Sequence, residues 1–302
     1  MSDMSFGAPQ LEFCRSLLFV PVPETRFVER AHERGAGAVI LDLEDGVAPE
    51  MKAQARGAVR EVAARLRSRG VTVLVRINHG SREDVEAAVS PDVAALVLPK
   101  TDSAGEIRGI AHLLDRRESA LGLNAGHTAL LVLIETPKAV CNAGTIAACH
   151  PRVTGLILGS EDLALALSVP PTPDSLRYAA ERVVMAARAA GKVPLGVPGS
   201  LATIKTPERF AEAVAAARRI GMAGAVCIHP AQVAVVREQF APDPWDVAEA
   251  RGILAAFAQA QKAGKGAVMH EGKMLDAPIV ERARKLVTEA SLHAQRAAPQ
   301  PA

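Results

Sequence analysis

Short aliphatic segments alternate with amphipathic segments along most of this chain. The aliphatic segments are rich in Val, Leu and Ile and are bounded by Gly, Pro or polar residues, a pattern typical of strands that are buried on both faces. Such strands are usual in parallel sheets that helices cover on their outer side. We expect strands at residues 16–20, 38–43, 71–77, 93–98, 129–134, 153–158, 193–197 and 225–228.

The segments between these strands have helical periodicity. Several begin near a proline and end at a glycine, as helices often do. We expect helices at residues 24–34, 49–69, 82–89, 104–117, 137–149, 173–190 and 207–220. Strands and helices that alternate in this way predict an α/β protein with a (β/α)₈ TIM barrel, which typically takes about 250 residues. A doubly wound sheet is the alternative, but no glycine-rich phosphate turn follows the first strand.

The predicted barrel domain covers residues 15–240, so the C-terminal part of the chain lies outside it. Residues 245–262 and 276–294 have helical patterns, and a glycine-rich linker at 263–274 separates them. We therefore expect a C-terminal helical extension over residues 241–295. We expect the two ends of the chain, residues 1–14 and 296–302, to be flexible.

Composition narrows the possible functions. The net charge is +2 and no basic tract carries interleaved aromatic residues, so we expect no nucleic-acid partner. The four cysteines form no CxxC pair, which favours reduced thiols. No apolar run reaches the roughly 18–20 residues that span a bilayer. The first residues also lack a secretory pattern, so we expect a cytoplasmic protein with no membrane contact.

Acidic residues stand where two neighbouring strands end. Glu135 follows the strand at 129–134, and Glu161 and Asp162 follow the strand at 153–158. The carboxyl ends of parallel strands converge on one rim, where α/β proteins bind ligands. Two carboxylates are what Mg²⁺ usually takes from a protein. The alternative is that Ser160 or Asp162 caps the next helix and Glu135 is a solvated loop residue.

Other charged residues are expected at the same rim. Arg76 lies in the third strand, and Glu44 and Asp45 follow the second. An arginine beside a metal site suits an anionic substrate such as a 2-oxo or 2-hydroxy acid, and a metal that polarises its carbonyl suits carbon–carbon bond chemistry. Alternatively, Arg76 neutralises a buried acid, Glu44 and Asp45 cap a helix, and Lys100 has a structural role.

At these residues the chain resembles the HpcH/HpaI aldolase and citrate lyase β-subunit superfamily, in particular its citrate lyase β-like branch. The matching segments occur in the order typical of the family and extend over nearly the whole chain. They are RSLLFVP (15–21), VILDLEDGVAPEMKAQAR (39–56), VRIN (75–78), LVLPKTDSA (96–104), IETPKAVCNAGTIA (134–147), GSEDLALAL (159–167), CIHPAQVAVV (227–236) and GKMLDAPIVERA (272–283).

The resemblance implies a Mg²⁺-dependent TIM-barrel enzyme, a homotrimer or hexamer, that cleaves or forms carbon–carbon bonds in hydroxyacyl-CoA substrates such as citramalyl-, malyl- or citryl-CoA. It implies that the metal ligands are Glu135 and Asp162, and that Arg76 contacts the substrate carboxylate. It further implies that Glu135 and the segment Gly159, Ser160 and Glu161 contact the 2-oxo acid. Catalytic roles near the acyl group fall to Glu44 and Asp45, together with Arg76.

The loop after the seventh strand departs from the family pattern. Members that act on acyl-CoA carry an aspartate there, whereas this chain has Gly196 at that place and no acid in VPLGVPGSLATIKT (193–206). We expect a magnesium-dependent carbon–carbon lyase that releases a 2-oxo acid. An acyl-CoA hydrolase and a non-catalytic barrel that binds a 2-oxo acid are the alternatives. The sequence leaves the acyl chain and the direction of reaction open.

Overall fold

The structure, a computed structural model, describes residues 10, 11, 13–262, 268–270 and 272–297. The chain divides into two compact units, residues 1–240 and residues 241–302. The expected domain bounds lie close to this division, and the expectation of flexible ends falls largely outside the described residues.

Eight parallel strands form one sheet in the first unit, and neighbours in the sheet follow one another along the chain except where β8 pairs with β1. Backbone contacts between Leu195 and Gly224 bring β7 against the segment before β8 and so nearly close the sheet into a barrel. The strands are β1 (Ser16–Pro21), β2 (Ala38–Asp42), β3 (Val73–Arg76), β4 (Ala95–Leu98), β5 (Ala129–Ile134), β6 (Val153–Leu158), β7 (Val193–Gly196) and β8 (Ala225–Cys227).

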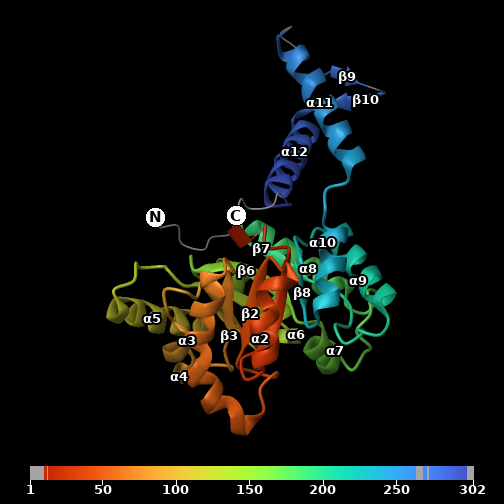
Figure 1. The fold of residues 1–302 in the computed structure, drawn as a ribbon. Helices are drawn as coiled ribbons and strands as arrows, with labels where there is room; N and C mark the ends of the chain where they lie inside the picture. The colour runs from red at the N-terminus through yellow and green to blue at the C-terminus, as the bar shows by residue number, and fades with distance from the viewer. Residues whose placement is uncertain (1–9, 12, 263–267, 271, 298–302) are drawn as a thin grey trace. The chain divides into compact units, whose positions relative to one another are not determined.

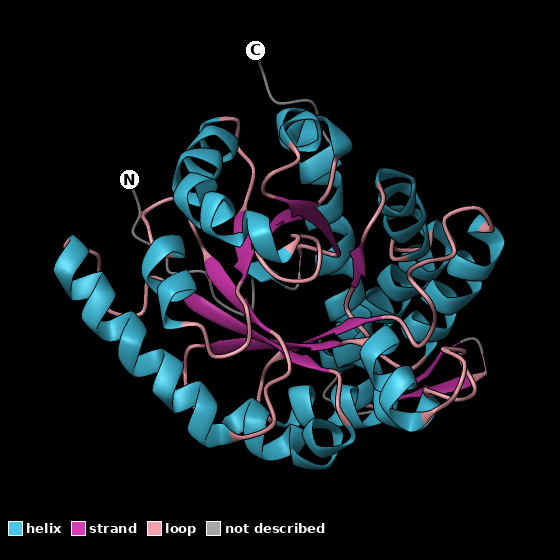
Figure 2. Ribbon diagram, turned by 90° about the horizontal axis from the view of Figure 1, so that it is seen from below, coloured by secondary structure: helices cyan, strands magenta, loops and turns pink. Residues whose placement is uncertain are grey.

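Helices connect the strands and surround them (Figures 1 and 2). The α-helices of this unit are α2 (Thr25–Arg30), α3 (Lys52–Ser68), α4 (Arg82–Ala88), α5 (Ala104–Leu121), α6 (Pro137–Ala148), α7 (Ser160–Leu167), α8 (Arg177–Ala189), α9 (Pro207–Arg219) and α10 (Pro230–Gln239), with short 3₁₀ turns η1 (Ala31–Arg34) and η2 (Pro49–Met51). The helix starts follow their sequence patterns. For example, Thr136 caps α6 by accepting a hydrogen bond from Ala139 N, and Pro137 occupies the first helical position.

Side chains alternate between two apolar layers along each strand. In β1, Leu17 points into the barrel interior with Ile40 of β2 and Leu74 of β3, whereas Leu18 packs outward against the helices. The interior is filled with aliphatic side chains and is a packed core, as in other barrels of this kind. Leu11 belongs to the interior layer and is fully buried.

The predicted TIM barrel with C-terminal helices is confirmed, and β5 and β6 have the predicted bounds. One expectation was wrong in part. The segment expected to be a glycine-rich linker contains a short antiparallel pair of strands, β9 (Val268–His270) and β10 (Lys273–Leu275). These strands are only three residues long, which is too short for hydrophobic periodicity to show.

The second unit consists of this strand pair and two helices, α11 (Pro244–Lys262) and α12 (Ala277–Ala297). Leu275 is fully buried, and Lys273 Nζ donates a 2.5 Å hydrogen bond to Glu249 of α11, so the strand pair is fastened to the first helix. None of the helices in the described part of the chain is long and apolar enough to span a membrane.

Candidate active site at the carboxyl end of the barrel

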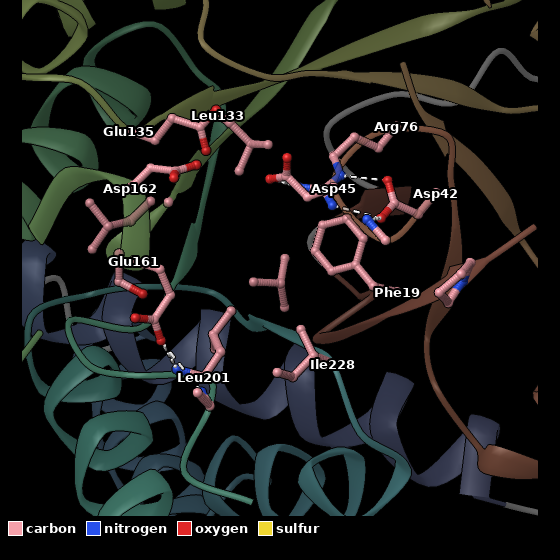
Figure 3. A pocket seen from close by; sticks show the side chains of 17 residues that line it. Phe19, Asp42, Asp45, Arg76, Leu133, Glu135, Glu161, Asp162, Leu201 and Ile228 are labelled. Carbon is pink, nitrogen blue, oxygen red and sulfur yellow. Dashed lines mark hydrogen bonds and ion pairs between the residues drawn. The ribbon is translucent and has the colours of Figure 1, made fainter. Parts of the chain in front are cut away.

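A cavity of about 380 Å³ opens at the carboxyl ends of the barrel strands (Figure 3). This is the end of a (β/α)₈ barrel at which active sites form. Charged groups occupy one part of the lining and aliphatic groups the rest. The lining residues are Phe19, Pro21, Asp42, Asp45, Gly46, Arg76, Leu133, Glu135, Leu158, Gly159, Ser160, Glu161, Asp162, Leu201, Ala202, Val226 and Ile228.

Glu135 is held at this rim by the end of β5 and by two neighbouring backbone segments. Its Oε1 accepts a 2.6 Å hydrogen bond from Lys100 N, and only 4% of the residue is exposed. A Cβ on Gly159 would lie 2.5 Å from Glu135 Oε2, so the carboxylate occupies space that only glycine leaves free. Glu135 is therefore not the solvated loop residue of the alternative hypothesis.

Burial raises the pKa of Glu135 to about 7. The Lys100 N–H group and the charge of Arg76 act in the opposite direction, while the nearby negative charges of Asp162 and Glu44 add to the rise. A cation bound between Glu135 and Asp162 would offset both the burial and the repulsion, because it favours the ionised form of each carboxylate.

The segment after β6 brings three polar side chains to the cavity. Gly159, not Ser160 or Asp162, is the N-cap of α7, so the capping alternative is wrong for both residues. Asp162 faces the cavity beside Glu135 (Figure 3). Ser160 Oγ is buried and has no hydrogen-bond partner among the described residues. Glu161 Oε1 instead accepts hydrogen bonds from Ser200 Oγ (2.6 Å) and Leu201 N (2.8 Å), which ties it to the loop after β7.

Arg76 makes a two-pronged contact with Asp42. Its Nε and Nη2 donate to the two carboxylate oxygens at 2.8 and 2.7 Å, and its guanidinium stacks 4.6 Å from the ring centre of Phe19. Nη1 forms an ion pair with Glu44 Oε2 at 2.9 Å. Arg76 therefore does neutralise a buried acid, as the alternative hypothesis holds, because Asp42 is only 2% exposed. These contacts still leave one N–H on each terminal nitrogen for a substrate.

The contacts of Arg76 affect its charge. Burial by itself lowers the pKa of Arg76, but the hydrogen bonds that it donates to Asp42 and the charges of Asp42, Glu44 and Asp45 more than offset it, so the pKa is raised. Arg76 is therefore a permanent, fixed positive charge at the cavity wall.

Lys100 joins the two acidic sides of the site. It has a left-handed backbone, with φ of 50°, which is uncommon for a residue other than glycine. In this conformation its N–H contacts Glu135 while its Nζ donates a 2.9 Å hydrogen bond to Glu44 Oε1. The hydrogen bond to Glu44 raises the pKa of Lys100. Strained backbone of this kind is often found at functional sites.

Glu44 and Asp45 differ in their access to the cavity. Glu44 is 5% exposed and lies between Arg76 and Lys100, and burial raises its pKa despite these two cations. The side chain of Asp45 is 59% exposed and lines the cavity, 3.8 Å from Arg76 Nη1 and 3.7 Å from Lys100 Nζ. Neither residue caps a helix.

A second polar network supports the segment that carries Glu44. Lys52 Nζ donates to the carbonyl oxygens of Leu43 (3.0 Å) and Glu44 (2.9 Å) and to Asn78 Oδ1 (2.7 Å). Asn78 in turn donates to Asp84, which is fully buried. This network fixes the backbone after β2, and so sets where Glu44 and Asp45 lie.

All the predicted site residues are thus found at one rim, but with different environments. One further residue, Asp42, belongs to the constellation and was not predicted as part of it, whereas Lys100 was expected at this rim with a structural role as the alternative. The position of Asp42 could have been inferred, because the last residues of two adjacent parallel strands, Asp42 and Arg76, are register partners. The left-handed backbone of Lys100 could not be predicted, because no feature of the sequence pattern indicates it.

The donor set fits a hard divalent cation. Glu135 and Asp162 offer carboxylate oxygens, and Ser160, whose Oγ has no hydrogen-bond partner among the described residues, lines the same cavity. No group of three His, Cys, Asp or Glu side chains that could enclose a metal is found in the described residues. Mg²⁺ needs only one or two protein carboxylates, since water and substrate complete its octahedron.

Comparisons with known proteins identify the family. The sequence model of the HpcH/HpaI aldolase/citrate lyase family matches residues 15–230, which include every residue of the cavity lining. This chain belongs to that family. The β subunit of citrate lyase from Haemophilus influenzae is 33% identical over 281 residues, covering 91% of this chain and 96% of that protein. A (3S)-malyl-CoA thioesterase from Cereibacter sphaeroides is 30% identical over 282 residues, covering 91% and 94%.

Solved structures of this family share the fold. The protein CitE from Mycobacterium tuberculosis, in complex with magnesium, acetoacetate and coenzyme A, has a TM-score of 0.72 and 30% identity, covering 92% of this chain and 98% of that chain. The citrate lyase β subunit from the same organism, complexed with oxaloacetate and magnesium, has a TM-score of 0.61 and 29% identity, covering 76% and 97%. These relatives bind magnesium and small acids.

Proposed function

We propose that this protein is a Mg²⁺-dependent carbon–carbon lyase that cleaves a hydroxyacyl-CoA into a 2-oxo acid and a shorter acyl-CoA. The observation that carries the proposal is the placement of Glu135 and Asp162 side by side in a cavity with Arg76. Such a set holds a 2-hydroxy or 2-oxo acid by its oxygens and leaves the adjacent carbon–carbon bond facing the remaining side chains. Magnesium-bound relatives of the same fold support it.

Each residue contributes a separate part of the chemistry. Glu135 and Asp162 would hold the metal, which supplies Lewis-acid stabilisation of the carbonyl oxygen that forms. Arg76 binds a substrate carboxylate with its remaining N–H groups, while Asp42 keeps its guanidinium oriented. Positive charge fixed before the reaction begins is effective because it requires no reorganisation in the transition state.

Cleavage requires two proton transfers and the movement of one electron pair. A base removes the proton of the substrate hydroxyl, the hydroxyl oxygen becomes the carbonyl of the 2-oxo acid, and the electrons of the broken carbon–carbon bond pass to the thioester as an enolate. The enolate then takes up a proton at carbon. Asp45 is placed to accept the first proton, since it lines the cavity. Glu44 holds Arg76 and Lys100 in position, and a direct catalytic role for Glu44 stays a prediction.

The test is release of 2-oxo acid from a panel of hydroxyacyl-CoA thioesters, measured with and without Mg²⁺. We expect Mg²⁺-dependent release of 2-oxo acid and a free acyl-CoA in equal amounts. The Glu135→Gln variant should need at least about tenfold more Mg²⁺ for half-maximal activity, because one charged ligand is lost. The exposed Glu61→Gln variant is the matched control. A Glu135→Gln enzyme with unchanged magnesium dependence would remove Glu135 from the metal site.

An acyl-CoA hydrolase is the second candidate. One relative is named a (3S)-malyl-CoA thioesterase, and the loop after β7 carries no acid that could protonate an enolate. Product analysis separates the two activities, because a hydrolase yields the free hydroxy acid and CoA without any 2-oxo acid.

A further inference from the structure

One side of the cavity is an apolar wall made of Leu201, Ala202, Val226 and Ile228. Leu201 and Ala202 come from the loop after β7, and Val226 and Ile228 from β8 and the residue that follows it. In Figure 3, Leu201 and Ile228 lie across the cavity from Glu135. The polar residues and the apolar wall therefore face a shared space, and a substrate held by the former presents a substituent to the latter.

Three of the four backbone N–H groups of the apolar wall, those of Leu201, Ala202 and Ile228, are already hydrogen bonded within the protein. Glu161 Oε1 accepts hydrogen bonds from Leu201 N at 2.8 Å and Ala202 N at 3.4 Å. Gln232 holds the wall from its other side. Its Oε1 accepts from Ile228 N at 2.8 Å, and its Nε2 donates to Leu201 O at 2.8 Å. A carboxylate placed here would lose its hydration without gaining these N–H groups as donors, which is unfavourable.

The charge of the cavity also disfavours a carboxylate substituent. Among the described residues that line it, five are carboxylates and one, Arg76, is a cation. Arg76 is already paired with Asp42 and Glu44, and Glu161 stands beside the apolar wall. Even with a divalent cation bound, the carboxylates outnumber the positive charges, so a second carboxylate on the substrate would be repelled.

We propose that the apolar wall selects 2-oxo acids that carry an alkyl substituent, and the hydroxyacyl thioesters that release them, over analogues with a second carboxylate. This inference rests on the lyase function proposed above. Each methylene that the wall buries should improve binding about fourfold, the value expected for removing one such group from water. A ligand of the same length that ends in a carboxylate gains no binding energy from the wall and is repelled by Glu161.

The experiment compares two ligands of equal length by calorimetry at saturating Mg²⁺. One is 2-oxopentanoate, which ends in a methyl group, and the other is 2-oxoglutarate, which ends in a carboxylate. We expect 2-oxopentanoate to bind at least tenfold more tightly. Pyruvate, measured with and without Mg²⁺, shows whether the metal-dependent site is formed.

Two lysine substitutions test whether the preference for 2-oxopentanoate depends on the apolar wall. Ile228→Lys adds a cation at the cavity, and we expect it to lower the preference for 2-oxopentanoate at least tenfold. Ile204→Lys is the matched control, because Ile204 has nearly the same exposure (42% against 43%) but lies outside the cavity lining. It should leave the preference within twofold of the unmodified protein.

The outcomes separate this inference from the function on which it rests. Mg²⁺-dependent binding with equal or tighter affinity for 2-oxoglutarate would overturn the inference and leave the lyase proposal standing. An alkyl preference that Ile228→Lys does not change would also overturn it. If none of these acids binds in a Mg²⁺-dependent way, the lyase proposal itself fails, and this inference fails with it.

Discussion

Gly159 has a φ angle of −90°, which any residue can adopt, so conformational freedom is not the reason for glycine here. The reason is space. A Cβ would lie 2.5 Å from both Glu135 Cβ and Glu135 Oε2, closer than such atoms approach in proteins. The glycine therefore lets the carboxylate of Glu135, directly after β5, lie against the start of α7, which also carries Asp162.

We predict that Gly159→Ala displaces the Glu135 carboxylate and weakens Mg²⁺ binding at least about tenfold, with a loss of stability of about 1–3 kcal/mol from overpacking. Isothermal titration with Mg²⁺ and chemical unfolding measure the two effects. Gly57→Ala in α3 is the control, because nothing lies within 4 Å of a Cβ there, and it should raise stability by about 0.5–1 kcal/mol. Unchanged Mg²⁺ affinity in Gly159→Ala would contradict this account.

At the scale of single residues, the sequence indicated which charges reach the rim but not how they pair. Strand ends placed Arg76, Glu135 and Asp162 together. Glu161, expected to contact substrate, lines the cavity and is also hydrogen bonded to the loop after β7. That contact joins residues about forty positions apart in the chain, and it depends on loop geometry that no local pattern encodes.

Among the elements, β5 and β6 were predicted most closely because they are continuous apolar runs with polar residues at both ends. The same region contains a buried ionic network that the pattern did not show. At the opposite end of the barrel, Arg152 before β6 donates to both oxygens of Glu118 in α5 at 2.8 and 2.6 Å. Glu118 also accepts from the N–H groups of Thr128 and Gly126, which holds the segment leading into β5.

This network predicts a pH dependence of stability. Burial raises the pKa of Glu118, but the hydrogen bonds from Arg152, Thr128 and Gly126 outweigh it, so the pKa lies below its ordinary value of 4.5. The stabilising contribution is therefore complete above about pH 4.5 and is lost as the pH falls through the lowered value. Glu118→Gln should cost up to about 3–5 kcal/mol at pH 7, since it leaves Arg152 buried without a full counter-charge.

Denaturant unfolding between pH 7 and pH 3.5 provides the measurement. The difference in unfolding free energy between the unmodified protein and Glu118→Gln should shrink below about pH 4.5. Glu61→Gln on the exposed face of α3 should show neither the loss nor the change with pH. A constant difference across this range would mean that Glu118 acts through packing rather than through its charge.

At the scale of the whole molecule, the second unit presents apolar side chains to solvent. Trp245 is 85% exposed and Met274 is 64% exposed. Large exposed apolar groups often mark contact surfaces. We therefore predict that residues 241–295 pack against a neighbouring subunit of a homotrimer or hexamer and help to cover the site of that subunit.

Light scattering on the full chain tests this assembly. Trp245→Glu combined with Met274→Glu should produce smaller species and reduced turnover together, because the neighbouring site loses its cover. Arg251→Glu, a charge change at an exposed residue of α11, is the control and should leave the assembly intact. A monomer at micromolar concentration with full activity would contradict the prediction.

The end of β7 and the loop that follows it carry no carboxylate. Gly196 has a φ of +117°, and a Cβ there would lie 2.9 Å from Leu158 Cβ and Leu158 O, so this backbone cannot present an aspartate. The remaining residues of the loop, 197–206, contain no acid. Glu161 contacts this loop, but its Oε1 already accepts hydrogen bonds from Ser200 Oγ and Leu201 N.

Proton transfer by a positioned group is typically worth about 10²–10⁴-fold in rate. We therefore predict slow turnover of thioesters that must release acetyl-CoA, such as malyl-CoA and citramalyl-CoA, because the enolate of acetyl-CoA then lacks its proton donor. Binding of pyruvate or glyoxylate with Mg²⁺ should be retained, since Glu135, Asp162 and Arg76 are all in place. Steady-state kinetics on the two thioesters, beside calorimetry on the two acids, separates a slow chemical step from weak binding. Efficient cleavage of either thioester would show that a carboxylate outside this loop, such as Asp45, supplies the proton.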